Sequence, residues 1–133
     1  MGMISYLFDT CSLIDLEGEK KRGEGRAHAF LSEQAEARAC ICWMVAGEFA
    51  EGFDDLHAPA CAAMLSLFDF LPCDEEVARH YALIARRLRS THQLIGANDL
   101  WIAATALAHR FPVVTNNQDH FGRVPGLMVV GYK

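Results

Sequence analysis

The sequence predicts an α/β fold in which a short, mostly parallel sheet is flanked by helices. Five short apolar runs rich in β-forming residues recur along the chain, continuous rather than alternating, as expected of strands covered on both faces. Helical patterns lie between the later runs, which favours parallel strands in a layered sandwich. The chain has 133 residues, a length that suits one domain with its own core. We therefore expect residues 1–133 to form a single domain.

The expected strands are Ile4–Phe8, Ala39–Cys42, Phe68–Leu71, Val113–Thr115 and Leu127–Val130. The polar run Glu17–Gly25 contains three glycines and is typical of an exposed loop. In parallel sheets of this kind, functional sites form beyond the carboxyl ends of the strands. The residues that follow each expected strand are therefore the first candidates for a site.

Two helices are expected in the second half of the chain. Residues 74–89 begin with three acids and end with arginines, as the helix dipole favours. One apolar stripe runs along this helix at helical spacing, formed by Val77, Tyr81, Ile84 and Leu88. Residues 98–110 form the second pattern, with Asn98 expected as the N-cap. The segment Ala58–Phe68 is apolar on nearly every side and is expected to be a buried helix.

Composition excludes several classes of protein. The chain carries 12 Lys and Arg against 17 Asp and Glu, a net charge of −5. It therefore does not bind nucleic acid through a generally basic surface. Its longest apolar stretch, Ala58–Phe68, is too short to span a bilayer, and its beginning lacks a secretory signal. The five cysteines are odd in number and lie in apolar segments, which favours reduced thiols used as small hydrophobes. We expect a cytoplasmic protein.

Three acidic residues are candidates for the site. Asp9 follows the first expected strand, where an N-cap is the ordinary explanation. Glu48 borders an apolar helical stripe, and a solvated edge position would explain it equally well. Asp99 falls in the first turn of a helix, where acids are common. Each residue alone is a weak signal.

Together, these acids could converge at one edge of the sheet. Two carboxylates about 4 Å apart repel by roughly 4 kcal/mol at an effective dielectric of about 20. Several such pairs would approach the whole stability of a small domain, about 5–15 kcal/mol. Such a cluster needs raised pKa values or a cation, and oxygen ligands favour Mg²⁺ or Mn²⁺ over zinc. The segment Val113–Phe121 supplies further oxygen donors after the fourth strand.

At this point the sequence resembles a known family. Phe8-Asp9-Thr10, Gly47-Glu48, Asn98–Ala104 and Val114–Leu127 occur in the order found in PIN-domain ribonucleases. The resemblance covers nearly the whole chain and is greatest to the VapC toxins of bacterial toxin–antitoxin pairs. It implies a PIN-like three-layer sandwich and an endoribonuclease that cleaves RNA phosphodiesters with water activated by Mg²⁺ or Mn²⁺.

The resemblance also assigns roles. Asp9, Glu48 and Asp99 would be the metal-holding acids, with Thr10 and Thr115 as supporting polar residues. For the fourth position of the site, Asn117 occupies the slot two residues after the threonine, and Asp119 is a nearby carboxylate slightly out of register. Two departures are visible: His120 replaces an acid that many relatives have, and Cys11 replaces a common Asn or Ser.

The implied partners are RNA, a VapB-like antitoxin that occupies an apolar groove, and a second copy of the chain in a homodimer. Arg79 and Arg86 lie opposite the apolar stripe of their helix. They are candidate contacts for RNA phosphates, although a solvated helix face explains them too.

Two other functions compete with the ribonuclease. One is a catalytically silent PIN module that binds RNA or a protein partner, which the departures at Asn117 and His120 would suit. The other is a phosphohydrolase of the haloacid-dehalogenase type, whose chemistry requires a second Asp two residues after the first. Cys11 occupies that position here. The histidines form no zinc-ligand spacing.

Overall fold

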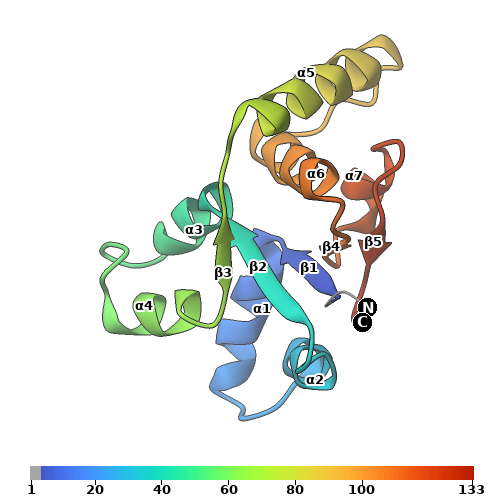
Figure 1. Ribbon diagram of the computed structural model, residues 1–133. Coiled ribbons are helices and arrows are strands. Elements are labelled where there is room, and N and C mark those ends of the chain that lie inside the picture. Colours follow the sequence, from blue (N-terminus) through green and yellow to red (C-terminus); the bar gives the residue numbers. More distant parts are fainter. Residues whose placement is uncertain (1–3) are drawn as a thin grey trace.

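A five-stranded sheet forms the centre of the computed structural model, which describes residues 4–133 (Figure 1). The start of the chain was expected to lack a secretory signal, and its first three residues lie outside this range. The strand order is β3-β2-β1-β4-β5, and every neighbouring pair is parallel. The strands are β1 (Ser5–Phe8), β2 (Arg38–Cys42), β3 (Asp69–Leu71), β4 (Val113–Val114) and β5 (Val129–Val130). All five expected strands are confirmed; β2 begins one residue earlier than expected, at Arg38, and the other four are shorter.

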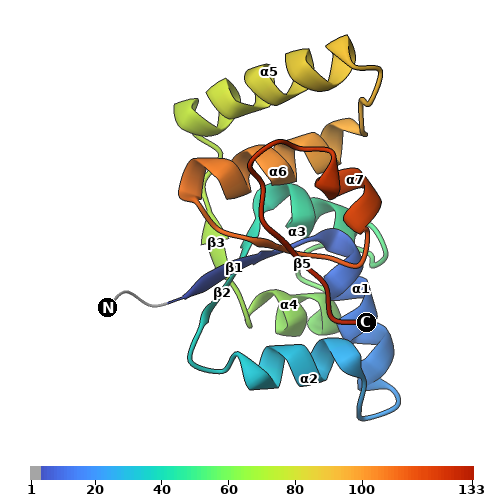
Figure 2. The ribbon, with the colours of Figure 1, turned by 90° about the vertical axis from the view of Figure 1, so that its right-hand side faces the viewer.

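Helices cover both faces of the sheet. They are α1 (Thr10–Lys20), α2 (Arg26–Glu33), α3 (Trp43–Ala50), α4 (Pro59–Leu65), α5 (Glu75–Ser90), α6 (Ala97–His109) and α7 (Gln118–Gly122). Helices α5 and α6 lie on one side, and α1, α2 and α4 on the other (Figures 1 and 2). Helix α3 contacts both α1 and α6, so it connects the two helical layers. The predicted three-layer sandwich is confirmed.

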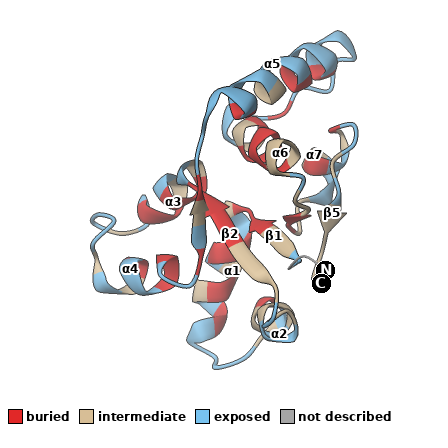
Figure 3. Cartoon of the chain, viewed as in Figure 1, coloured by how far each residue is buried: buried red, intermediate tan, exposed pale blue. Residues whose placement is uncertain are grey.

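The core lies in the central strands and the inner faces of the helices (Figure 3). Leu7, Ile41 and Val113 on three adjacent strands are fully buried, as continuous apolar runs predict for a covered sheet. On α5, the stripe at Val77, Ile84 and Leu88 is buried as expected. Asp74 caps this helix by accepting a hydrogen bond from the amide of Val77 (3.1 Å). Within residues 4–133, no helix is long and apolar enough to cross a membrane.

The polar run Glu17–Gly25 is the exposed loop that the sequence predicted only from Lys21 to Glu24. Helix α1 continues to Lys20, and Glu19 is buried. Its carboxylate accepts hydrogen bonds from the amides of Ala27 (3.0 Å) and His28 (2.9 Å), which are free donors in the first turn of α2. A Cβ at Gly25 would lie 2.1 Å from the Glu19 carboxyl carbon, so glycine permits this close approach. The glutamate of one helix thus caps the next.

Three smaller expectations are corrected. Gly96, not Asn98, is the N-cap of α6. Cys11 and Cys73 are exposed, whereas the other three cysteines are buried as expected. The segment Ala58–Phe68 is not buried all round. Helix α4 buries Cys61, Met64 and Leu65 but leaves Pro59, Ala62 and Ala63 exposed.

Candidate active site

Asp9 lies at the carboxyl end of the central strand β1 and is the N-cap of α1. Its side chain is buried, and its Oδ1 accepts hydrogen bonds from the Ser12 amide (2.9 Å) and the Ser12 hydroxyl (2.7 Å). The N-cap explanation is therefore correct, but it accounts for one carboxylate oxygen. The other oxygen, Oδ2, accepts a hydrogen bond from the hydroxyl of Thr115.

The sheet register brings Asp9 and Thr115 together. Phe8 in β1 pairs with Val114 in β4, so the residues that follow each of them are neighbours at the same edge. The amide of Asp9 donates to the Val114 carbonyl (3.2 Å) and continues the ladder by one step. Thr115 Oγ1 also accepts a hydrogen bond from the amide of Asn117 (2.8 Å), which fixes the start of the following loop.

Glu48 lies on α3 and is hydrogen-bonded to the two segments that carry the other acids. Its Oε1 accepts a hydrogen bond from the hydroxyl of Thr10 (2.6 Å), the residue after Asp9. Its Oε2 accepts one from the side-chain amide of Asn98 (3.0 Å), the residue before Asp99. Because both partners are sequence neighbours of the other acids, these two bonds hold the starts of α1 and α6 against α3.

Asp99 lies in the first turn of α6, as predicted, and its side chain is 29% exposed. Its Oδ2 lies 3.4 Å from His120 Nδ1, and that nitrogen is 3.0 Å from the side-chain amide nitrogen of Asn117. Nδ1 either donates to Asp99 or accepts from Asn117, so the position of the imidazole proton selects one contact. Asn117 and His120 thus occupy the side of the site next to Asp99.

The charge of Asp99 acts on the buried carboxylate of Asp9. Burial raises the pKa of Asp9 above its ordinary value, hydrogen bonds from Thr115 and Ser12 oppose this, and the charge of Asp99 raises it further. Cys11 lies close to the same acids. Partial burial raises the pKa of its thiol, and the charges of Asp9, Asp99, Asp15 and Glu48 raise it further. Negative charge therefore concentrates at this edge of the sheet.

These residues fit a hard divalent cation by their chemistry. Within residues 4–133, no Lys or Arg lies within 4 Å of the Asp9, Glu48 or Asp99 carboxylates. The donors are oxygens, which Mg²⁺ and Mn²⁺ prefer. In the described chain, however, no three His, Cys, Asp or Glu side chains are already arranged to hold a metal ion. The acids form a loose cluster rather than a closed cage.

Within residues 4–133, the remaining predicted residues form no ion pair with these acids. Asp119 is in the first turn of α7 with its side chain 79% exposed, and it pairs with Arg123 at 2.9 Å. Arg79 is exposed on α5 and lies 3.7 Å from Glu76. Arg86 is exposed near the end of α5 that adjoins the start of α6 (Figure 2). The geometry favours Asn117 over Asp119 as the fourth polar position beside the acids.

Two contributions escaped sequence reasoning. The first is Ser12, which donates two hydrogen bonds to Asp9. The sequence does contain a signal for this contact, because a serine three residues after an N-cap Asp places its hydroxyl beside the carboxylate. Asp15 lies one turn further along α1 and accepts a hydrogen bond from the Tyr132 hydroxyl (2.5 Å). Burial raises the pKa of Tyr132, and the bond to Asp15 adds to this. No local pattern links residues 117 positions apart.

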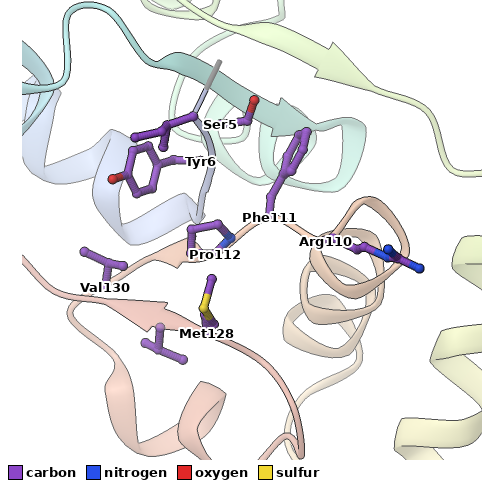
Figure 4. Close-up of a pocket in the computed structure, with 9 residues that line it drawn as sticks. Ser5, Tyr6, Arg110, Phe111, Pro112, Met128 and Val130 are labelled. Carbon is purple, nitrogen blue, oxygen red and sulfur yellow. The ribbon is translucent and has the colours of Figure 1, made fainter. Parts of the chain in front are cut away.

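Two hollows lie at opposite ends of the strands. One of about 650 Å³ lies at the amino end, lined by residues that include Tyr6, Phe111 and Met128 (Figure 4). It contains none of the acids described above. A smaller hollow of about 460 Å³ lies beside α3, and its lining includes Glu48 and Asn98. Only the second of these two adjoins the acidic cluster.

Comparison with known families agrees with this geometry. The profile of the PIN domain matches residues 6–127, which include all of the acids described above. The chain belongs to the PIN-domain family. This membership confirms the resemblance seen in the sequence and sets aside the haloacid-dehalogenase alternative.

Relatives place this PIN domain in the VapC group. The chain is 43% identical over 65 residues to Ribonuclease VapC of Rickettsia bellii, and this match spans about half of each chain, 49% and 48%. It is 32% identical over 138 residues to Ribonuclease VapC1 of Rickettsia felis, covering 98% of this chain and 96% of that one. The structure of VapBC2 from Rickettsia felis bound to a promoter DNA fragment has a similar fold, with a TM-score of 0.82, 21% identity and coverage of 98% and 100%.

Proposed function

We propose that this PIN domain is a metal-dependent endoribonuclease and the toxin of a toxin–antitoxin pair. The observation that carries the proposal is the pair of hydrogen bonds from Thr10 and Asn98 to Glu48, which bring three uncompensated carboxylates to one sheet edge. The names of the VapC relatives, which are ribonucleases, support the activity. The VapBC assembly of the similar structure supports a VapB-like protein partner.

Asp9, Glu48 and Asp99 would hold Mg²⁺ or Mn²⁺. When bound, the ion supplies charge neutralisation at the scissile phosphate and a bound water of lowered pKa. The protein residues do the positioning. Ser12 and Thr115 fix both oxygens of Asp9, so this carboxylate cannot rotate freely. Asn117 and His120 lie beside Asp99, where they can orient water or a phosphate oxygen.

We further propose that the protein acts in the cytoplasm, as a homodimer, on RNA. All five cysteines are free, and three are buried in the core, as in a reducing compartment. Light scattering of the purified chain tests the homodimer. Arg79 and Arg86 are both exposed on α5 and are the candidate arginines for contacts with RNA phosphates.

Cleavage of total RNA by the purified chain tests the function. We expect cleavage with Mg²⁺ or Mn²⁺, none with EDTA, and a loss of at least about 100-fold in Asp9→Asn and in Asp99→Asn, the scale of removing one electrostatic contribution to catalysis. Asp119→Asn is the matched control, because this exposed acid pairs with Arg123. Full activity in both Asp9→Asn and Asp99→Asn would remove the carboxylates from the mechanism. No cleavage by the wild-type chain under any of these conditions would favour the catalytically silent PIN module.

A further inference from the structure

Trp43 is an exposed aromatic side chain at the edge of the sheet that carries the acids. It is the first residue of α3 and directly follows β2, the strand next to β1. The residue is 57% exposed, whereas tryptophan is highly buried on average. The ring centroids of Trp43 and Phe70 lie 4.3 Å apart at an angle of 47°, so packing fixes the indole while it remains open to solvent.

Trp43 forms one wall of the hollow that reaches Glu48. Its lining consists of Trp43, Met44, Gly47, Glu48, Glu51 and Asn98. A Cβ at Gly47 would meet nothing within 4 Å, so the space above this glycine is open. The hollow therefore continues the carboxylate site toward β3 and offers an aromatic face next to polar side chains.

We infer that this hollow is a nucleobase subsite, in which an unpaired base of the RNA strand held at the carboxylates stacks on Trp43. The inference rests on the proposed function for the identity of the strand. Base–aromatic stacking is a common way in which proteins hold single-stranded RNA, and the stacked contact itself involves no basic side chain. This suits a chain with a net charge of −5.

The lining distinguishes a base from a second copy of the chain. Contacts between copies favour apolar cores depleted in charge, whereas this hollow has Glu48, Glu51 and Asn98 beside its single aromatic wall. A base presents a flat face to the indole and a polar edge to these carboxylates and amides. A base is also joined to a phosphate through its own ribose. A base in the hollow can therefore belong to the same strand as a phosphate at the acids, because Glu48 is part of both the hollow and the acidic cluster.

Binding of a single-stranded oligocytidylate RNA to the full chain tests the subsite. The chain has two tryptophans, so Trp101→Phe leaves Trp43 as the only indole, and Asp9→Asn prevents cleavage in the presence of Mg²⁺. We expect the RNA to quench Trp43 fluorescence saturably. With labelled RNA, Trp43→Ala should weaken binding by about 5- to 150-fold, the equivalent of one stacked base, and Trp43→Phe should restore most of it.

Leu67→Ala is the matched control, because Leu67 is also 57% exposed but lies outside the hollow. We expect it to leave RNA affinity unchanged. Absence of quenching with equal affinity in Trp43→Ala would overturn the inference. So would loss of an oligomer in Trp43→Ala, measured by light scattering, without loss of RNA affinity. RNA binding through Trp43 by a wild-type chain that cleaves nothing would instead contradict the proposed function and leave the subsite in place.

Discussion

Helix α1 carries a buried carboxylate at each end, and the two have opposite chemistry. Glu19, near the carboxyl end, receives two backbone amides of α2 and lies 3.2 Å from His28 Nδ1. Burial alone would raise the pKa of Glu19, but these hydrogen bonds outweigh it and lower that pKa. Asp9, at the amino end, also receives hydrogen bonds, but burial dominates and Asp99 adds repulsion, so the pKa of Asp9 is raised.

The two acids differ in how their charge is met: the charge of one is compensated within the chain, and the charge of the other is opposed by a neighbouring carboxylate. The charge of Glu19 is compensated within the chain by otherwise free donors of a helix start. The charge of Asp9 is opposed by that of Asp99, which is unfavourable for folding but favourable for cation binding. Burial alone therefore does not distinguish the two acids, whereas the sign of their electrostatic surroundings does.

The largest change is expected when Glu19 is removed. Glu19→Ala leaves the amides of Ala27 and His28 without their acceptor, and each unsatisfied buried donor costs about 1–3 kcal/mol. We expect a loss of about 3 kcal/mol in the free energy of unfolding, or about 10 °C in Tm. Urea and thermal unfolding measure both. Glu24→Ala, at an exposed glutamate in the same run, should change neither; an equal loss in the two variants would contradict the capping role.

The two acids should also respond to pH with opposite signs. The folded pKa of Glu19 is lowered, so its stabilisation is present above the unfolded value of about 4.5 and is lost as pH falls through the folded pKa. The folded pKa of Asp9 is raised, so its contribution is present below about 3.8 and is lost as pH rises through the folded pKa.

Urea unfolding of the metal-free chain as a function of pH measures these contributions. Each group can change the free energy of unfolding by at most about 1.4 kcal/mol per pH unit. Relative to the wild type, Glu19→Gln should lose stability chiefly above pH 4.5 and converge with the wild type in acid. A constant difference across the whole range would mean that the Glu19 charge plays no part.

A smaller effect is expected at Asp9. Asp9→Asn removes the charge that Asp99 repels, which favours folding, but its amide nitrogen cannot accept the hydrogen bond that the Thr115 hydroxyl donates to Oδ2, which opposes folding. We therefore expect the free energy of unfolding of the metal-free variant to stay within about 1 kcal/mol of the wild type. Added Mg²⁺ should raise the Tm of the wild type by mass action and raise that of the variant much less. Equal shifts in both proteins would place the ion elsewhere.

The features that could be predicted from the sequence are those set by residues close together in the chain. The strands were predictable because each is a continuous apolar run covered on both faces, a property set by neighbouring residues. Asp9 and Asp99 were predictable as residues at a strand end and a helix start. Thr115 was expected as the last residue of the fourth strand, and its supporting role was implied by the family resemblance; the parallel register brings it to Asp9.

The errors arise where tertiary contacts override local preference. Asn98 has the local preference of an N-cap, but its amide binds Glu48, which is 50 residues away, and Gly96 takes the cap. Glu19 lies in a run of charged residues and glycines typical of loops, yet the turn at residues 21–25 folds α2 back onto it. Neither contact has a signature within one helical turn, so spacing alone could not identify it.

The smallest effect is expected at Asp119, an acid that pairs with Arg123 and not with the members of the acidic cluster. Asp119 is four residues from Arg123 on the protein surface, and exposed pairs of this kind contribute about 0.3–0.5 kcal/mol. Asp119→Asn should therefore change the free energy of unfolding by less than about 0.5 kcal/mol and RNA cleavage by less than about 2-fold. Asn117→Ala should have a larger effect on cleavage, because Asn117 contacts His120 beside Asp99. If Asp119→Asn instead reduced cleavage as much as Asp99→Asn does, Asp119 would have to turn away from Arg123 into the cluster during catalysis, and the fourth position would belong to it.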